Sequence, residues 1–110
     1  MQRLQHRRDF LHAAQRGKRA ARPGLVLQAV PNEAPDVRVG FTATKKLGGA
    51  VVRNRVKRRL REAARLTIPA LALQGWDLVL IGRDATATRP FPELLADLQG
   101  ALRQAGVVAR

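Results

Sequence analysis

A dense group of cationic side chains in the middle of the chain has the composition of a phosphate-binding surface. Seven Arg or Lys residues lie between Arg53 and Arg65, and Glu62 is the only carboxylate among them. On a helical wheel, apolar residues from Val52 to Ala63 share one face and the cations cover the rest. A helix face that only has to be soluble would mix the signs, because cations one turn apart repel by roughly 0.2–0.5 kcal/mol per pair. The pattern predicts a polyanion-binding helix that uses Arg53, Asn54, Arg55, Lys57, Arg58, Arg59, Arg61 and Arg65.

Two further cations precede that helix in a turn that contains glycine. Lys45 and Lys46 belong to the segment Thr44-Lys45-Lys46-Leu47-Gly48-Gly49. The first turn of a helix offers backbone N–H groups and the positive end of the helix dipole to an anion. We therefore expect Lys45 and Lys46 to contact phosphate beside the helix start. The segment lacks the Gly-Lys-Ser/Thr spacing of a P-loop, which argues against ATP or GTP hydrolysis.

The residue types that carry hydrolytic chemistry are scattered along the chain. Its eight carboxylates show no metal-ligand spacing, cysteine is absent, and His6 and His12 do not share a helix face. A protein nuclease needs a carboxylate cluster that holds a metal ion, or a positioned general base. The sequence therefore predicts no catalytic residue and no metal site in this chain.

The composition favours nucleic acid as a partner. The formal net charge is +13 on 110 residues, and such self-repulsion is tolerated most easily where a polyanion neutralises it. A membrane surface is the weaker candidate, because no basic segment carries the apolar face of an interfacial helix. No apolar run reaches the roughly 18 residues of a membrane span, and the first residues lack the apolar centre of a signal peptide. We expect one cytoplasmic RNA-binding domain over residues 1–110.

A small set of helices and strands must position these side chains. Apolar residues recur at helical spacing in residues 8–15, 53–66 and 91–105. Strand-like composition marks residues 25–30, 37–44 and 77–83. The order α-β-β-α-β-α predicts an α+β sandwich with a small mixed sheet, in which the basic helix connects two strands in a β-α-β crossover.

The central segments resemble a known family. The resemblance rests on Val37-Arg38-Val39-Gly40-Phe41, on Lys45-Lys46-Leu47-Gly48, on Arg53-Asn54-Arg55 with Lys57-Arg58, and on the strand Asp77-Leu78-Val79. In this order they resemble the signature of the bacterial ribonuclease P protein component. The spacing from Phe10 to Leu102 also fits, so the resemblance covers nearly the whole chain.

This resemblance implies a protein cofactor of the catalytic ribonuclease P RNA. That RNA would use magnesium to remove the 5′ leader of precursor tRNA, and the protein alone would bind no cofactor. The Arg-Asn-Arg helix would face the catalytic RNA, and a cleft between the first helix and the sheet would hold the leader. The crossover around the basic helix would be left-handed, against the usual rule.

Strand alternation gives a separate prediction for the cleft. In residues 37–44, the core face would carry Val37, Val39, Phe41 and Ala43, and the open face Arg38, Gly40, Thr42 and Thr44. In residues 25–30, the core face would carry Leu25, Leu27 and Ala29, and the open face Val26, Gln28 and Val30. The expected leader cleft therefore consists of Phe10, Val26, Gln28, Arg38, Thr42 and Thr44.

Stacking in this cleft would be limited. Phe10 matches an aromatic residue of the family's cleft, although it could equally anchor the first helix to the core. Ala14 and Gln28 occupy positions where relatives can carry aromatics. Backbone and hydrogen-bond contacts to the leader are therefore favoured over base stacking.

Two other classes of function remain open from the sequence. A structural RNA-binding protein of the ribosomal type would carry the same charge on a similar fold, but would not depend on precursor tRNA. A DNA reader is less well supported, because the basic helix has no second helix joined by a short turn and no heptad zipper.

Overall fold

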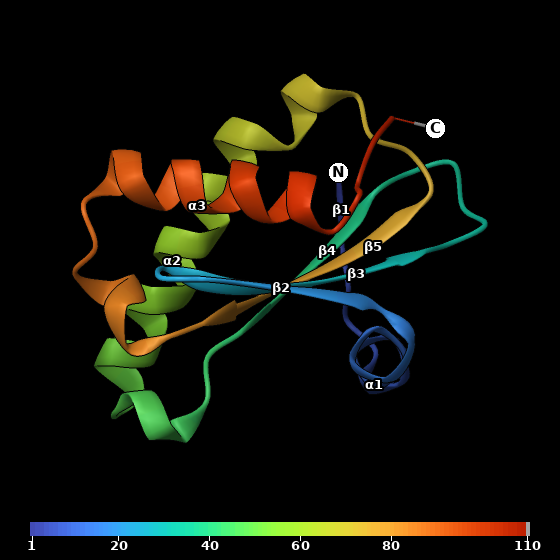
Figure 1. Ribbon diagram of the computed structural model, residues 1–110. Helices are drawn as coiled ribbons and strands as arrows, with labels where there is room; N and C mark the ends of the chain where they lie inside the picture. Colours follow the sequence, from blue (N-terminus) through green and yellow to red (C-terminus); the bar gives the residue numbers. More distant parts are fainter. Residues whose placement is uncertain (110) are drawn as a thin grey trace.

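A computed structural model describes residues 1–109, which form one mixed sheet with helices on both faces (Figure 1). Within these residues the sheet has five strands in the order β1-β4-β5-β3-β2. The strands are β1 (Gln2–Arg3), β2 (Lys18–Arg22), β3 (Leu25–Pro31), β4 (Arg38–Thr42) and β5 (Trp76–Gly82). The helices are α1 (Arg7–Arg16), α2 (Ala50–Thr67) and α3 (Phe91–Gln104), with 3-10 helices η1 (Lys45–Leu47), η2 (Pro69–Leu71) and η3 (Asp84–Ala87).

The strand directions confirm the predicted α+β fold with a mixed sheet. β4 is parallel to both β1 and β5, whereas β3 is antiparallel to β5 and to β2. The chain passes from β4 through α2 into the neighbouring strand β5, so the basic helix connects two parallel strands as expected.

Two strands were not predicted. β2 has the sequence Lys-Arg-Ala-Ala-Arg, which has neither strand propensity nor alternation, and it exists because all five residues pair with β3. β1 is only two residues long and pairs with β4 at the opposite edge. The basic helix also begins at Ala50, one turn before the predicted start at residue 53.

The larger apolar core lies between the sheet and the helices α2 and α3. α2 packs on β4 and β5, and α3 packs on β2 and β3. Val39, Leu80, Leu60 and Leu98 are fully buried there. This core fixes α2 against the sheet and leaves the helix's other face outside.

α1 covers part of the opposite sheet face (Figure 1). Its Ala13 is buried in a smaller cluster with Leu4, Val30 and Val79, and the Phe10 ring packs against that cluster. Gly40 allows this close contact, because an added Cβ at that position would lie 2.6 Å from two carbon atoms of the Phe10 ring. α1 and α2 therefore lie on opposite sides of one sheet. No helix within residues 1–109 is both long enough and apolar enough to cross a membrane.

Candidate nucleic-acid interface

The side of α2 that faces away from the sheet is cationic. Val56, Leu60 and Ala63 are buried against the core, as the wheel predicts. Val52 was expected on the same face, but it lies beside Gly48 in the preceding turn and remains 39% exposed. Exposed polar side chains on the outer surface are Asn54, Arg55, Arg58, Arg61 and Arg65, and Arg53 and Lys57 are half-buried at its margin.

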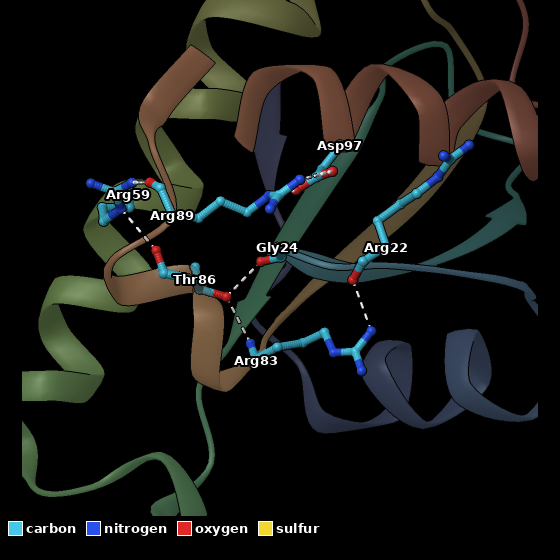
Figure 2. A network of polar contacts seen from close by, with 7 residues as sticks. All are labelled: Arg22, Gly24, Arg59, Arg83, Thr86, Arg89 and Asp97. Carbon is cyan, nitrogen blue, oxygen red and sulfur yellow. Dashed lines mark hydrogen bonds and ion pairs between the residues drawn. The ribbon is translucent and has the colours of Figure 1, made fainter. Parts of the chain in front are cut away.

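Arg59 is directed at protein carbonyl groups. Its Nε donates to the Thr86 carbonyl at 2.9 Å, and its Nη2 donates to the Arg89 carbonyl (Figure 2). Its guanidinium also lies 5.8 Å from the centre of the Phe91 ring, within cation–π range. Burial, together with the nearby charge of Arg55, lowers the pKa of Arg59. The sequence placed Arg59 among the RNA contacts, whereas the structure uses at least two of its donors inside the protein.

Arg55 makes a similar contact from the preceding turn of α2. Its Nε donates to the Ala87 carbonyl at 2.9 Å, although the side chain stays exposed. A guanidinium has five N–H donors, so the exposed Arg55 keeps donors for a further partner beside this contact. The hydrogen bonds of Arg55 and Arg59 hold η3 against α2.

η3 is also joined to the sheet by a polar network (Figure 2). The Thr86 hydroxyl donates to the Gly24 carbonyl at 2.6 Å and accepts from the backbone N–H of Arg83 at 2.7 Å. Arg83 donates through Nη1 to the Arg22 carbonyl at 2.8 Å. Arg89, which follows η3, forms an ion pair with Asp97 on α3. α2, α3 and the β2–β3 turn therefore meet at η3, which fixes the direction of the cationic helix.

Arg65 forms the one ion pair along the outer face of α2 in the described part of the chain. Its Nε lies 3.0 Å from a Glu62 carboxylate oxygen, one turn back, and this hydrogen bond lowers the pKa of Glu62. Because Arg65 is 63% exposed at its side chain, it keeps donors for a further partner. Arg58 and Arg61 have no such carboxylate neighbour among residues 1–109.

The turn before α2 places both lysines at the start of the basic helix. Lys45 and Lys46 are exposed in η1, directly ahead of Gly48 and Gly49. Gly49 is the N-cap residue of α2 and has no side chain to bond the first N–H groups. The positive end of the helix dipole is thus flanked by two ammonium groups, an arrangement suited to an anion.

The strand-face predictions for β3 and β4 are confirmed. Val39, Leu25 and Leu27 are in the core, and Val30 and Gly40 face α1. The face beside α1 is less open than the sequence suggested, because α1 covers Val30 and Val79. Val26, a predicted cleft residue, is only 5% exposed.

The part of this face beyond α1 forms an open strip across four strands. Register places Thr42, Ile81, Val26 and Ala21 side by side on β4, β5, β3 and β2. Thr42 and Ile81 are half-buried and Ala21 is exposed. On the side nearer α1, half-buried Gln28 pairs with exposed Arg19. We call these six residues the open strip.

Of the open strip, the sequence identified Thr42, Val26 and Gln28 but missed Ile81, Ala21 and Arg19. Ile81 follows Val79 at the spacing of a strand face, but its neighbours depend on the pairing order of the strands. Ala21 and Arg19 belong to β2, which gives no strand signal. Arg83 extends past the end of β5 on the side of the sheet that carries α1 (Figure 2).

Three predicted cleft residues lie outside the open strip. The Phe10 ring is half-buried against the smaller cluster, with one edge above Gly40. Thr44 is exposed beyond the end of β4, next to Lys45. Arg38 is on the expected face, but its Nε and Nη2 bind the two carboxylate oxygens of Asp77 at 2.8 and 2.7 Å.

Arg38 is surrounded by negative charge. Asp77 is 3% exposed and raises the pKa of Arg38, and Asp9 of α1 lies 3.8 Å from the same guanidinium. Asp77 also accepts a hydrogen bond from the Asn32 amide at 2.6 Å. Two carboxylates around one guanidinium would repel a phosphate, so the geometry favours a structural role for Arg38 over leader contact.

Four of the eight carboxylates are partners of arginine. Asp9 and Asp77 adjoin Arg38, Glu62 pairs with Arg65, and Asp97 pairs with Arg89. Residues 1–109 bring together no group of three His, Asp or Glu side chains that could hold a metal ion.

Comparisons with known proteins agree on one family. A family model described as Ribonuclease P matches residues 1–106. The ribonuclease P protein component of Gluconacetobacter diazotrophicus is 55% identical over 106 residues, which cover 96% of this chain and 91% of that protein. That of Ruegeria pomeroyi is 54% identical over 105 residues, covering 92% of this chain and 83% of that protein.

Solved structures show the same fold. The RNase P protein of Staphylococcus aureus matches with a TM-score of 0.81 at 27% identity, covering 97% of both chains. The RNase P protein of Thermotoga maritima matches with a TM-score of 0.80 at 29% identity, covering 94% of this chain and 97% of that one.

Proposed function

Since the chain belongs to the ribonuclease P protein family, we propose that it is the protein cofactor of a catalytic RNA that removes the 5′ leader from precursor tRNA. The protein binds two RNA segments in this proposal. The outer face of α2 contacts the catalytic RNA, and the open strip contacts the leader.

The observation that carries this proposal is the position of the two surfaces on opposite faces of one sheet. α2 packs on one face of β4 and β5, and the open strip crosses the other face of the same strands. One rigid domain can therefore bind both RNAs at once. Two polyanions repel each other, and a cofactor with a net charge of +13 offsets that repulsion.

The catalytic-RNA surface consists of residues that the fold leaves exposed. Arg58, Arg61 and Arg65 project from successive turns, Asn54 and Arg53 precede them, and Lys45 and Lys46 flank the start of α2. Each cation that neutralises a phosphate releases counterions, so this binding depends steeply on salt. Arg59 contributes by fixing the helix through η3.

The leader lies along the open strip. Thr42 and Gln28 offer hydrogen bonds, Val26 and Ile81 form a low apolar floor, and Phe10 borders the strip from α1. Arg19 and Arg83 supply charge for the leader phosphates. The strip has no aromatic ring apart from the edge of Phe10 among the described residues, so the contacts favour the backbone of the leader.

The bond cleavage belongs to the RNA. Magnesium ions bound by that RNA would supply the activated water for hydrolysis. The carboxylates of residues 1–109 fit such an ion poorly, because no three of them come together and because Asp9 and Asp77 both adjoin the positive charge of Arg38. The chain's own residues bind and orient the two RNAs.

Reconstitution tests this function. The purified protein is mixed with the ribonuclease P RNA of its own organism at physiological magnesium, and affinities for precursor and mature tRNA are compared. We expect the protein to increase affinity for precursor tRNA and to leave mature tRNA unchanged. Equal effects on both tRNAs would support the alternative, a structural RNA-binding protein without a role in tRNA processing.

A further inference from the structure

An apolar groove separates the C-terminal ends of α2 and α3. It has a volume of about 350 Å³ and opens to solvent beside η2. Leu66 of α2, Leu71 of η2 and Leu102 of α3 line it, together with Val107. Leu66 is 48% exposed and Leu71 is 43% exposed. Neither the α2 surface nor the open strip uses this groove.

The rim of the groove carries polar groups of a particular kind. Gln99 and Arg103, both exposed on α3, belong to its lining, and no carboxylate does among the described residues. A side-chain amide can pair with the edge of a nucleobase, and a guanidinium can neutralise a phosphate. An apolar floor for the base, an amide for its edge and a cation for its phosphate can together hold an unpaired nucleotide.

The groove is continuous with the cationic face of α2. Leu66 follows Arg65 directly, and Arg65 ends the row of Arg58, Arg61 and Arg65 on successive turns. An RNA strand that follows this row toward the end of α2 reaches the groove. The open strip is on the other face of the sheet, so the groove adjoins the catalytic RNA and not the leader.

We propose that this groove takes an unpaired nucleobase of the catalytic RNA. The inference rests on the proposed function, because α2 must bind that RNA for the groove to be reached. The base lies against Leu66 and Leu71 with its edge toward Gln99, and Arg103 meets the adjoining phosphate. The contact adds apolar binding to an interface that otherwise consists of charge.

Removing the apolar floor tests the proposal. The double variant Leu66→Ser/Leu71→Ser should weaken binding to the catalytic RNA roughly threefold to thirtyfold, the scale of one lost base contact. The dependence of affinity on salt should not change, because an apolar contact releases no counterions. Leu11→Ser is the matched control, since Leu11 is 46% exposed on α1. Should the double variant fold poorly, Leu66→Gln alone keeps the test valid.

Cross-linking identifies the occupant. The chain has no cysteine, so Leu71→Cys carries a photo-reactive label at one position only. We expect a cross-link to a single unpaired nucleotide of the catalytic RNA, and none from Leu11→Cys. Labelling of paired regions alone, or no RNA label, would overturn the proposal. Unchanged RNA affinity in the double variant would overturn it too, and would leave the groove to a protein partner.

Arg58→Ala separates the failure of this inference from failure of the proposed function. If Arg58→Ala lowers RNA affinity and the groove variants do not, only the nucleobase contact is wrong. If neither changes the affinity, α2 is not the RNA surface and both proposals fall.

Discussion

Arg38 on β4 and Asp77 on β5 form a two-pronged ion pair across neighbouring parallel strands, with N–O distances of 2.8 and 2.7 Å. The pair lies beside the start of α1, where Asp9 approaches the same guanidinium. It connects two central strands and the helix that borders the open strip.

Arg38→Ala should therefore destabilise the protein. The variant leaves the buried Asp77 carboxylate without its main partner, which costs about 1–3 kcal/mol of unfolding free energy. Denaturant unfolding measures this loss, and Asp9→Asn, at the longer distance, should cost less. Normal stability combined with weaker precursor binding would instead identify Arg38 as the leader contact that the sequence indicated.

Arg58→Ala should weaken binding to the catalytic RNA without unfolding the protein. Arg58 is exposed on α2, and an exposed cation among other cations adds little to stability. The slope of log affinity against log salt should fall by about one for each lost phosphate contact. A titration across salt concentrations measures the slope, and an unchanged slope with a lower melting temperature would contradict the prediction.

Arg59→Ala, at the next residue, should instead lower the stability of the protein and leave its phosphate contacts with the RNA unchanged. Two backbone carbonyls, of Thr86 and Arg89, would lose their donor, at a cost of about 1–3 kcal/mol of unfolding free energy. Below its new melting temperature the variant should bind the catalytic RNA with an unaltered salt slope. A normal melting temperature with a reduced slope would show that Arg59 is a phosphate contact after all.

Thr42→Val should reduce affinity for precursor tRNA and spare mature tRNA. The change keeps the shape of the side chain and removes its hydroxyl from the open strip. A hydrogen bond to a charged phosphate contributes roughly 1.5–3 kcal/mol, so the affinity for precursor tRNA should fall by at most about tenfold to hundredfold. Thr88→Val, at an exposed position after η3, is the control. If discrimination between the two tRNAs is unaltered, the leader does not follow this strip.

Val39→Ala should affect stability alone. Val39 lies three residues before Thr42 on the same strand, but it is fully buried on the other face of the sheet. The cavity should lower the unfolding free energy by about 1–3 kcal/mol. The affinity for both RNAs should then fall only in proportion to the folded fraction of the variant. Unfolding and binding measurements at one temperature test this proportionality. Selective loss of precursor affinity would mean that the strand faces are assigned in reverse.

The sequence predicted those parts of the fold that depend on local pattern. Leu60 and Val56 mark the buried side of α2 by helical spacing, and Val39 marks the core side of β4 by alternation. β2 could not be found this way, because Lys18 to Arg22 become a strand only by pairing with β3. The residues that β2 adds to the open strip were missed for the same reason.

The site predictions were limited by contacts between distant segments. Arg55, Arg58 and Arg59 look alike in the sequence, and only the position of η3, some 30 residues later, separates them. Arg38 has the right parity for the open face, but parity does not reveal that Asp77 is directly beside it. The pattern thus identified the faces of β3 and β4, but it did not identify the partners of the side chains there, and it placed Val52 on the buried face of α2, where 39% of that residue stays exposed.

Gly40 determines how near α1 comes to the sheet. A methyl group at residue 40 would meet the Phe10 ring at 2.6 Å, so the ring and the helix behind it would have to move outward. The distance of α1 and the Phe10 ring from the sheet, beside the open strip, therefore depends on Gly40 having a hydrogen atom where other residues have a side chain. Gly40→Ala should therefore move the helix that borders the open strip without changing any residue of the strip itself.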